Sequence, residues 1–519
     1  MEKYMNNFRL KCLLFPGIYL FLLSGCTVGP RYHPPSATLQ PPPIAYKELP
    51  KDSQNPNDWK VAQPQDAMLH GKWWEIYHDA ELNALEEQLN INNQNIRQSF
   101  ENFMEARALV AQARAQLFPT VAFAPSFQRS SSSSSLNSSS NSSSSGGGSG
   151  SGSTSNSARS TYTLPLEASW APDLWGKVRN TIHEFQYNAQ LSAADLENER
   201  LTEQASLAVF FFELRGQDAV QKIFDATVEA DKKSVELTRA RYETGVDTEI
   251  SLVQAENALQ TAEAASTNLA IARAQFEHAI AMLIGAPASN FSMPVKPLDA
   301  APPEIPVGVP SQLLERRPDI AASERNMASA NAQIGIATAA FYPNLNLSAQ
   351  GGLESSALKT LFNASSRFWS VGPSVSETLF DAGLRRATVN QFVALYNANV
   401  AGYRQTVLNA FQQVEDNMAA VRILSREIQQ QQDAEKSAER FLELAQARYE
   451  TGVDQYLNVL VAQTTLLNDQ QQLANLRTQA MTASVQLIEA LGGGWDRSQL
   501  PTPAQVSQKV TKSAIESPQ

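Results

Sequence analysis

The chain is poor in the residues that most often carry catalysis and metal binding. Its 519 residues include only two cysteines and five histidines. None of them forms a Cys-x-x-Cys or His-Glu-x-x-His motif, which excludes the common zinc sites. Glycine-rich nucleotide-binding motifs are missing too, since the glycine run at residues 146–148 lies in a low-complexity stretch. We therefore expect a protein that is not an enzyme and has no metal or cofactor.

The chain also lacks a basic excess and long apolar runs. Acidic residues outnumber basic ones, 52 to 41, for a formal net charge of −11. A net-acidic chain without basic clusters argues against nucleic acid as a partner. After the first 25 residues no stretch contains 18 consecutive apolar residues, so no transmembrane helix is predicted beyond residue 25.

Residues 1–25 have the pattern of a lipoprotein signal peptide. Basic residues at positions 3, 9 and 11 precede a short apolar segment. The segment ends in Leu-Ser-Gly-Cys, which resembles the bacterial lipobox and makes Cys26 the predicted lipidation site. The alternative is an ordinary signal peptide with a chance cysteine. Thr27 follows, in place of the aspartate associated with inner-membrane retention, which favours the outer membrane.

Long blocks with few helix-breaking residues dominate the rest of the chain. Residues 26–79 form a predicted tether, extended because proline is frequent up to residue 64. Beyond it, residues 80–118 contain neither glycine nor proline, and residues 173–286 and 374–500 contain no proline. Alanine, glutamine, glutamate and leucine are abundant there, so long helices are predicted.

Four short segments between these blocks alternate apolar and polar residues. They follow Pro119, precede Pro172, follow Pro343 and span residues 369–376. Each has about ten residues, the length of a tilted strand that crosses a bilayer, although a soluble pair of hairpins would show the same alternation. The first two are joined by a Ser/Gly-rich stretch, residues 129–160, which is predicted to be an exposed loop without fixed structure.

An internal repeat is the strongest signal in the sequence. The octapeptide Ala-Arg-Tyr-Glu-Thr-Gly-Val-Asp at residues 240–247 recurs unchanged at residues 447–454, an offset of 207. The same offset relates Gly176 to Gly383 and Gly285 to Gly492. We infer two structural repeats, 80–285 and 311–493, with a linker at 286–310 and a tail at 494–519. Each repeat should run helix, strand, loop, strand, long helix, tight turn, long helix.

The octapeptide occupies the predicted tight turn of each repeat. Gly245 and Gly452 can adopt the left-handed conformation that ends a helix, and Asp247 and Asp454 can cap the next one. A simple hairpin turn would require only these glycines and aspartates. Retention of Arg, Tyr and Glu in both copies exceeds that requirement, which predicts a docking role.

Four strands cannot close a barrel, and an open sheet edge cannot lie in lipid. Two chains would give eight strands filled by their own side chains, whereas three would give twelve with room for a channel. The predicted fold is mainly α with membrane β, in which several chains together close the barrel and their long helices form a hollow cylinder below the membrane.

Several motifs together resemble the TolC-like outer-membrane efflux proteins, in the lipoprotein branch typified by OprM and NodT. The resemblance covers nearly the whole chain. It rests on the lipobox, Trp73-Trp74, Phe118-Pro119, residues 173–177, 314–320 and 380–383, both octapeptides and residues 492–495. It implies a homotrimer in the outer membrane that is anchored by the Cys26 lipid. In this trimer an α-helical periplasmic barrel would be continuous with a 12-stranded transmembrane β-barrel, with four strands from each protomer. It also implies a passive duct for small molecules, working with a periplasmic adaptor and an inner-membrane pump of the resistance-nodulation-division type.

The resemblance also implies particular site residues. Both turns would form the periplasmic tip that meets the adaptor, and Leu457 would line an apolar constriction. Val461 occupies a position where some relatives carry an aspartate. The docking residues are Arg241, Tyr242, Gly245, Val246, Asp247, Arg448, Tyr449, Gly452, Val453 and Asp454. Contacts among their Arg, Tyr and Asp members are the expected latch.

Two other functions fit parts of the sequence. A duct for a type I protein secretion pump would share the architecture, although the lipoprotein branch argues against it. A lipid-anchored coiled-coil scaffold without a pore would explain the lipobox and the helices. It would not explain the paired strands.

Overall fold

The computed structural model describes residues 27–39, 46–48, 71–131, 158–305 and 310–508. Cys26 and the predicted signal peptide lie outside these residues. So do most of the predicted tether, residues 132–157 of the Ser/Gly-rich stretch and the end of the tail.

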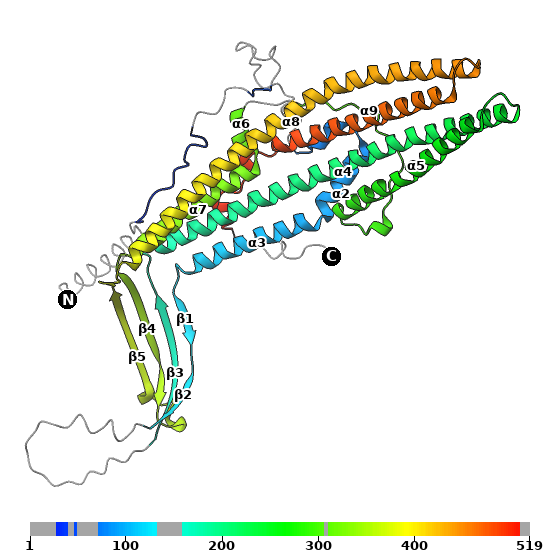
Figure 1. The fold of residues 1–519 in the computed structure, drawn as a ribbon. Coiled ribbons are helices and arrows are strands. Elements are labelled where there is room, and N and C mark those ends of the chain that lie inside the picture. Colours follow the sequence, from blue (N-terminus) through cyan, green and yellow to red (C-terminus); the bar gives the residue numbers. More distant parts are fainter. Residues whose placement is uncertain (1–26, 40–45, 49–70, 132–157, 306–309, 509–519) are drawn as a thin grey trace, which may run out of the picture.

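The described chain has a long helical body with a small sheet at one end (Figure 1). The hairpin turns lie at the opposite end of the body. This confirms the prediction of a mainly helical fold with a small set of strands. The helices of the first repeat are α2 (Ala80–Asn92), α3 (Gln94–Ala115), α4 (Lys177–Glu243) and α5 (Glu249–Leu283). Those of the second are α6 (Pro310–Arg316), α7 (Pro318–Ala339), α8 (Leu384–Glu450) and α9 (Tyr456–Ala490).

The two hairpins of long helices have equal dimensions. Helices α4 and α8 contain 67 residues each, and α5 and α9 contain 35 each. Every helix boundary in the second hairpin lies 207 residues after its counterpart, the offset of the octapeptide. At 1.5 Å per residue the longer helices extend about 100 Å. None of the helices in the described residues has the length and apolar character needed to cross a membrane.

The main hydrophobic core lies in the middle of the body. The short 3-10 helix η3 (Trp73–Tyr77) inserts Trp73 and Trp74 there, against α2, α4, α5 and α9. Phe211 of α4 and Ile280 of α5 are buried in the same core. The described end of the predicted tether is therefore part of the packed body.

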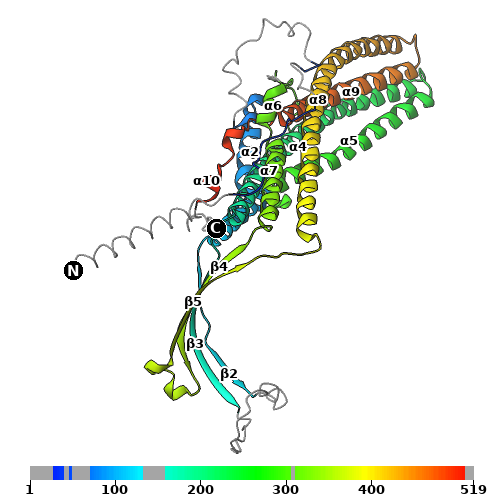
Figure 2. The same ribbon diagram turned by 90° about the vertical axis from the view of Figure 1, so that its left-hand side faces the viewer.

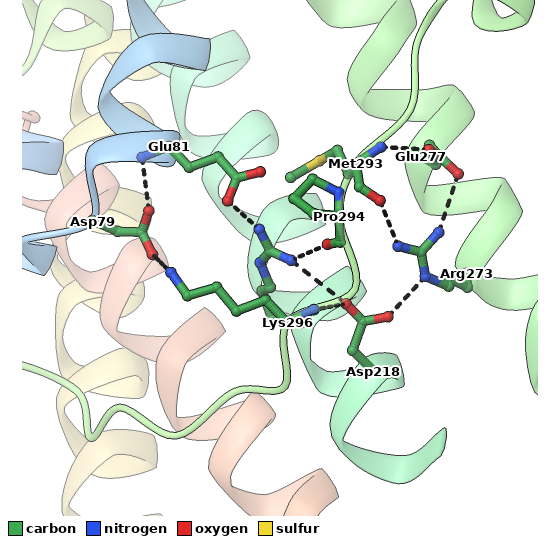
Figure 3. A network of polar contacts seen from close by, with 9 residues as sticks. Asp79, Glu81, Asp218, Arg273, Glu277, Met293, Pro294 and Lys296 are labelled. Atoms are coloured by element: carbon green, nitrogen blue, oxygen red, sulfur yellow. Dashed lines mark hydrogen bonds and ion pairs between the residues drawn. The ribbon is translucent and has the colours of Figure 1, made fainter. Parts of the chain in front are cut away.

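A buried ionic network fixes the segment after α5 to the long helices (Figure 3). Asp218 of α4 accepts a hydrogen bond of 2.7 Å from Arg273 of α5 and one of 2.9 Å from the Lys296 backbone amide. Arg273 also donates to the Met293 carbonyl at 2.8 Å. Arg215 lies 3.5 Å from Asp218, so this buried carboxylate faces two guanidinium groups. A buried charge is tolerated when it is paired and hydrogen-bonded in this way.

The sheet is antiparallel and contains β1 (Thr120–Phe123), β2 (Ser126–Ser130), β3 (Arg159–Trp170), β4 (Asn344–Ser355) and β5 (Arg367–Ser376). Both β1 and β2 pair with β3, so they form one strand with an interruption at residues 124 and 125. The Ala124 amide donates to the Pro165 carbonyl of β3 at 3.4 Å, but Pro165 has no amide hydrogen to donate in return, which explains the break in what was predicted as one segment. Strands β3 and β4 pair and thereby join the two repeats. Figure 2 shows the sheet extending away from the helices as a twisted ribbon.

The strand register gives the sheet one apolar and one polar face. Residues that pair directly across an antiparallel sheet lie on the same face. One row across the strands is Phe123, Leu166, Gly351 and Trp369, and the next is Val121, Ala168, Ala349 and Val371. The opposite face carries polar pairs such as Glu167 and Gln350, which are hydrogen-bonded at 3.0 Å. The apolar side chains of Val121, Phe123, Trp369 and Val371 are largely exposed in the single chain.

Candidate functional site: the hairpin tips

The two octapeptides form turns with nearly the same backbone. Gly245 and Gly452 have φ angles of 74° and 75°, the predicted left-handed conformation. In each turn the amide of the following valine donates to the carbonyl of the arginine five residues earlier, at 2.9 Å. These bonds satisfy carbonyls at the helix end that would otherwise lack a partner.

The predicted capping role of the two aspartates is wrong by one residue. The residues at the cap positions of α5 and α9 are Thr248 and Gln455, both in extended conformation. Asp247 instead accepts from the Thr248 amide and the Ser251 hydroxyl, both at 2.7 Å. Each aspartate therefore lies one residue before the N-cap of the following helix.

Tyr449 connects the two turns. Its hydroxyl donates a 2.6 Å hydrogen bond to Asp247 Oδ2 in the first turn. Its ring lies beneath the Arg241 guanidinium, with 4.7 Å between Cζ and the ring centroid. Arg241 also donates to the Glu450 carbonyl at 3.1 Å. Only 4% of Tyr449 is exposed, so this tyrosine is largely removed from water.

The protonation states favour this contact at neutral pH. Burial tends to raise the pKa of Asp247, but hydrogen bonds from Tyr449, Ser251 and the Thr248 amide outweigh it and hold that pKa below its usual value. Burial and the hydrogen bond to Asp247 raise the pKa of Tyr449. A neutral phenol therefore donates to an ionised carboxylate, and hydrogen bonds of this kind are stronger than neutral ones.

The second turn carries the same residues in a more open arrangement. Arg448 Nε donates to Asp454 Oδ2 at 2.9 Å, which lowers the pKa of Asp454. Tyr242, the counterpart of Tyr449, is 41% exposed. Its hydroxyl has no hydrogen-bond partner within the part of the chain that the structure describes. Of the six expected latch residues, the structure thus brings together Arg241, Asp247 and Tyr449, and separately Arg448 and Asp454.

Sequence reasoning missed two contributors to the contact. The Tyr456 ring packs edge-on against Tyr449, with centroids 5.5 Å apart, and the Thr238 hydroxyl lies 3.5 Å from the Tyr449 hydroxyl. Comparison of the two repeats could have pointed to both residues. At the equivalent positions of the other repeat, 207 residues away, Glu249 stands for Tyr456 and Ala445 stands for Thr238, so the two hairpins differ at both.

A partly polar seam continues between the hairpins beyond the turns. Asp231 of α4 is buried there, and burial raises its pKa to about 6. Burial likewise raises the pKa of Tyr456 to about 12. The side-chain amide of Gln463 donates to the Ser234 hydroxyl at 3.3 Å. The seam therefore contains a carboxyl group that can titrate near neutral pH.

Apolar side chains are exposed around both turns. Val246 and Val453 occupy equivalent places in the two octapeptides, and about two thirds of each is exposed. Leu457, the predicted constriction residue, lies in the first turn of α9 and is half exposed, as is Val461 one turn later. The tip thus combines a buried polar contact with exposed apolar side chains around the turns.

Comparison with known families covers most of the chain. The model of the outer membrane efflux protein family matches residues 85–286 and 309–493. A probable efflux pump outer membrane protein of Pseudomonas putida, TtgC, is 30% identical over 512 residues, which is 98% of this chain and 99% of that protein. Outer membrane protein OprJ of Pseudomonas aeruginosa is 29% identical over 487 residues, covering 91% of this chain and 94% of that protein.

The fold is also shared with a solved structure. The outer-membrane channel OprN matches with a TM-score of 0.77 at 28% identity, over 91% of this chain and 100% of that chain. The family model matches most of both repeats, and the solved structure covers most of the chain. The chain belongs to the outer membrane efflux protein family.

Proposed function

We propose that three copies of this chain form a passive duct through which small molecules leave the cell. The chain is an outer-membrane efflux protein, and its family consists of channel proteins, so we propose no catalytic role. The energy for export would come from an inner-membrane pump of the resistance-nodulation-division type. A periplasmic adaptor would connect that pump to the duct.

The two-faced sheet is the observation that carries this proposal. Its apolar face suits lipid, and its polar face suits a water-filled lumen. The outer edges of β1, β2 and β5 have no strand partner among the described residues. Unpaired backbone groups in lipid cost several kcal/mol each, so other copies of the chain must complete the sheet. Three copies supply twelve strands, enough for an open channel.

The position of Thr27 supports the lipid anchor at Cys26. The Val28 amide donates to the Trp175 carbonyl at 3.1 Å, and Trp175 donates through its indole to the Pro343 carbonyl. A Cβ atom on Gly176 would lie only 2.9 Å from Thr27 Cα. These contacts hold the residue after Cys26 where the helices meet the sheet. A lipid on Cys26 would therefore enter the leaflet nearest the helical body.

The tips are the proposed docking site for the adaptor. They lie at the end of the helical body farthest from the sheet (Figure 1) and expose apolar side chains around the turns. We propose that residues 241–247 and 448–454 contact the adaptor. We also propose that Leu457 narrows the closed tip, and that adaptor binding separates the hairpins at the Tyr449 contact.

Conductance tests the duct. We expect purified wild-type protein in planar bilayers to show small conductance steps, because we propose that the tip is closed when no adaptor is bound. Tyr449→Phe removes the hydrogen bond to Asp247 and should increase both step size and open time. Absence of conductance from both proteins, with trimers intact by native mass spectrometry, would favour the scaffold without a pore.

Replacing Gly452 tests the docking site. Valine cannot adopt a φ of 75° without a penalty of about 1–2 kcal/mol, so Gly452→Val should distort the second turn locally. We expect trimers in the outer membrane but loss of drug resistance in a strain that depends on this chain. Gly402→Ala, inside α8 with open space around it, is the matched control and should retain resistance. Normal resistance with Gly452→Val would rule out docking at this turn.

A further inference from the structure

We propose that Arg129 and Arg367 bind the phosphate groups of a lipid in the outer leaflet of the membrane, on the outside of the duct. This inference rests on the proposed duct, because it requires the sheet to be inserted in the outer membrane. It starts from two positive charges on the apolar face of the sheet. No other residue on that face of the five described strands is charged.

The strand register places both arginines on the apolar face. Arg129 of β2 pairs with Ser160 of β3. Arg367 of β5 pairs with Leu353 of β4, which in turn pairs with Leu164 of β3. Along β3, Ser160 and Leu164 keep the even spacing of the apolar row, and side chains at even spacing share a face. Both guanidinium groups therefore belong to the side of the sheet that suits lipid.

Both arginines lie at the end of the sheet that is farthest from the helical body (Figure 1). The next residue on the same face, towards the body, is aromatic in each strand: Phe127 in β2 and Trp369 in β5. Phe127 packs against Tyr162, with 4.7 Å between the ring centroids. An apolar band followed by aromatic rings and then by positive charge is the order expected where a barrel passes from hydrocarbon into lipid head groups.

Neither arginine has an acidic partner within the part of the chain that the structure describes. Both are exposed. The acidic residues of the strands, Glu167 and Glu354, lie on the polar face, where they cannot neutralise charges on the apolar one. A guanidinium group is planar and can donate two hydrogen bonds to one phosphate. Lipid phosphates lie just outside the hydrocarbon, so they are the anions within reach of this face.

The two arginines belong to opposite edges of the sheet. Both β1 and β2 pair with β3, and the order continues through β4 to β5, so Arg129 lies on one edge and Arg367 on the other. In the proposed barrel the β2 edge of one copy meets the β5 edge of the next. The outer surface of each seam then carries one arginine from each copy. A lipid with more than one phosphate suits such a site, which favours lipid A, the phosphorylated glycolipid of bacterial outer leaflets.

Arg159 is the internal contrast to this pair. It pairs with Ser130 at the same end of the sheet and is also exposed. It is adjacent to Ser160 in β3, so its side chain lies on the polar face. In the duct that face lines the lumen, which lipid does not reach. Arg159 therefore supplies a matched control with the same charge at the same level.

Native mass spectrometry of the full-length protein tests the proposal. We would titrate purified trimers in detergent with bis-phosphorylated lipid A and count the lipids bound. The wild type should bind it several-fold more tightly than phosphatidylglycerol or dephosphorylated lipid A with the same acyl chains. Arg129→Gln/Arg367→Gln should lose this preference, whereas Arg159→Gln should keep it. Arg129→Lys/Arg367→Lys retains the charge without the planar donors and should bind with intermediate affinity.

The outcomes separate this inference from the proposed duct. Equal binding of lipid A by the wild type and Arg129→Gln/Arg367→Gln, with trimers intact, overturns the inference and leaves the duct standing. Displacement of lipid A by inorganic phosphate at a similar concentration also overturns it, because the site would then be one for free phosphate. If no trimers form, the duct fails and this inference fails with it.

Outer membranes give a second readout. Trimers extracted with their surrounding lipid in polymer nanodiscs should carry several-fold less lipid A, relative to phospholipid, when Arg129 and Arg367 are both replaced by glutamine. Arg159→Gln should leave this ratio at the wild-type value. The same ratio in all three proteins would show that the arginines do not select this lipid.

Discussion

Asp231 and Asp247 belong to the same hairpin, yet their surroundings shift their pKa values in opposite directions. Burial raises the pKa of Asp231 to about 6, whereas hydrogen bonds from Tyr449 and Ser251 overcome burial and lower the pKa of Asp247. The ionised form of Asp231 is therefore unfavourable in the folded protein. The ionised form of Asp247 is favourable.

These shifts have opposite consequences for stability. The folded state binds a proton on Asp231 more tightly than the unfolded state does, so lowering the pH from 7 towards the unfolded value near 4 should stabilise the fold. The contribution of Asp247 is present above its unfolded pKa and is lost only as the pH falls through its lowered value. Mild acid should therefore tighten the seam between the hairpins before it weakens the turn.

Replacing Asp231 with asparagine tests the first effect. We expect Asp231→Asn to raise the melting temperature of the detergent-solubilised protein at pH 7.5, because no charge is then buried in the seam. Its stability should also vary less between pH 7 and pH 5 than that of the wild type. Asp433→Asn, at an exposed position on α8, is the control and should change neither property. An unchanged pH profile for Asp231→Asn would contradict the assigned pKa.

The repeated octapeptide allowed the latch residues to be predicted as a group but not as pairs. Two identical segments contain no information about which tyrosine binds which Arg–Asp pair. The distinguishing residues lie outside the octapeptide, at Thr238 and Tyr456. Their role depends on helix packing, which appears only when α4, α8 and α9 are placed together.

At the level of elements, the long helices tolerate glycine for two different reasons. Gly216 lies where α4 crosses α9, and a Cβ there would be 2.8 Å from Thr478 Cγ2 and nearer still to the hydroxyl. Gly402 of α8 has open space around it. The first glycine allows two helices to approach closely, and the second has no such role in the single chain.

Alanine at these two positions should therefore have opposite effects. Gly216→Ala forces the helices apart, and overpacking of this kind costs about 1–3 kcal/mol. Gly402→Ala should stabilise by about 0.5–1 kcal/mol, because alanine restricts the unfolded chain and favours helix. Chemical denaturation of the two purified variants measures both. A gain in stability for Gly216→Ala would show that the α4–α9 contact is not close.

The strands show what the alternation of apolar and polar residues in a sequence can and cannot predict. The sequence indicated the segments and their apolar positions, since side chains alternate between the two faces of a strand. It did not indicate that β3 pairs with β4 across the repeats, because strand order depends on contacts far apart in the chain. Nor did it reveal the interruption at residues 124 and 125, opposite Pro165 of β3, which divides the first strand in two.

At the level of the whole molecule, the lipid and the sheet are two separate proposed attachments to the membrane. Cys26→Ser should abolish incorporation of a palmitate analogue, because serine cannot receive the lipid in this pathway. We expect the variant to remain in the outer-membrane fraction, since the apolar sheet face would still hold it. Metabolic labelling and membrane fractionation measure the two properties independently.

Each result of that experiment bears on one attachment. Label remaining on Cys26→Ser would show that the lipid lies elsewhere. Release of the variant into the periplasm would argue against insertion of the sheet. Wild-type protein and the exposed-surface variant Asp433→Asn are the controls, because Asp433 lies on α8, away from both attachments.

The equal length of α4 and α8 has a mechanical consequence. Both helices begin after a left-handed glycine next to the sheet, contain 67 residues and end in the same octapeptide. In a ring of three copies all six turns would then reach the same height and form a level rim. Inserting seven residues into each helix of only one hairpin would raise three of the six turns by about 10 Å. A partner seated on that uneven rim would leave gaps, and an exported molecule would leak into the space between the membranes.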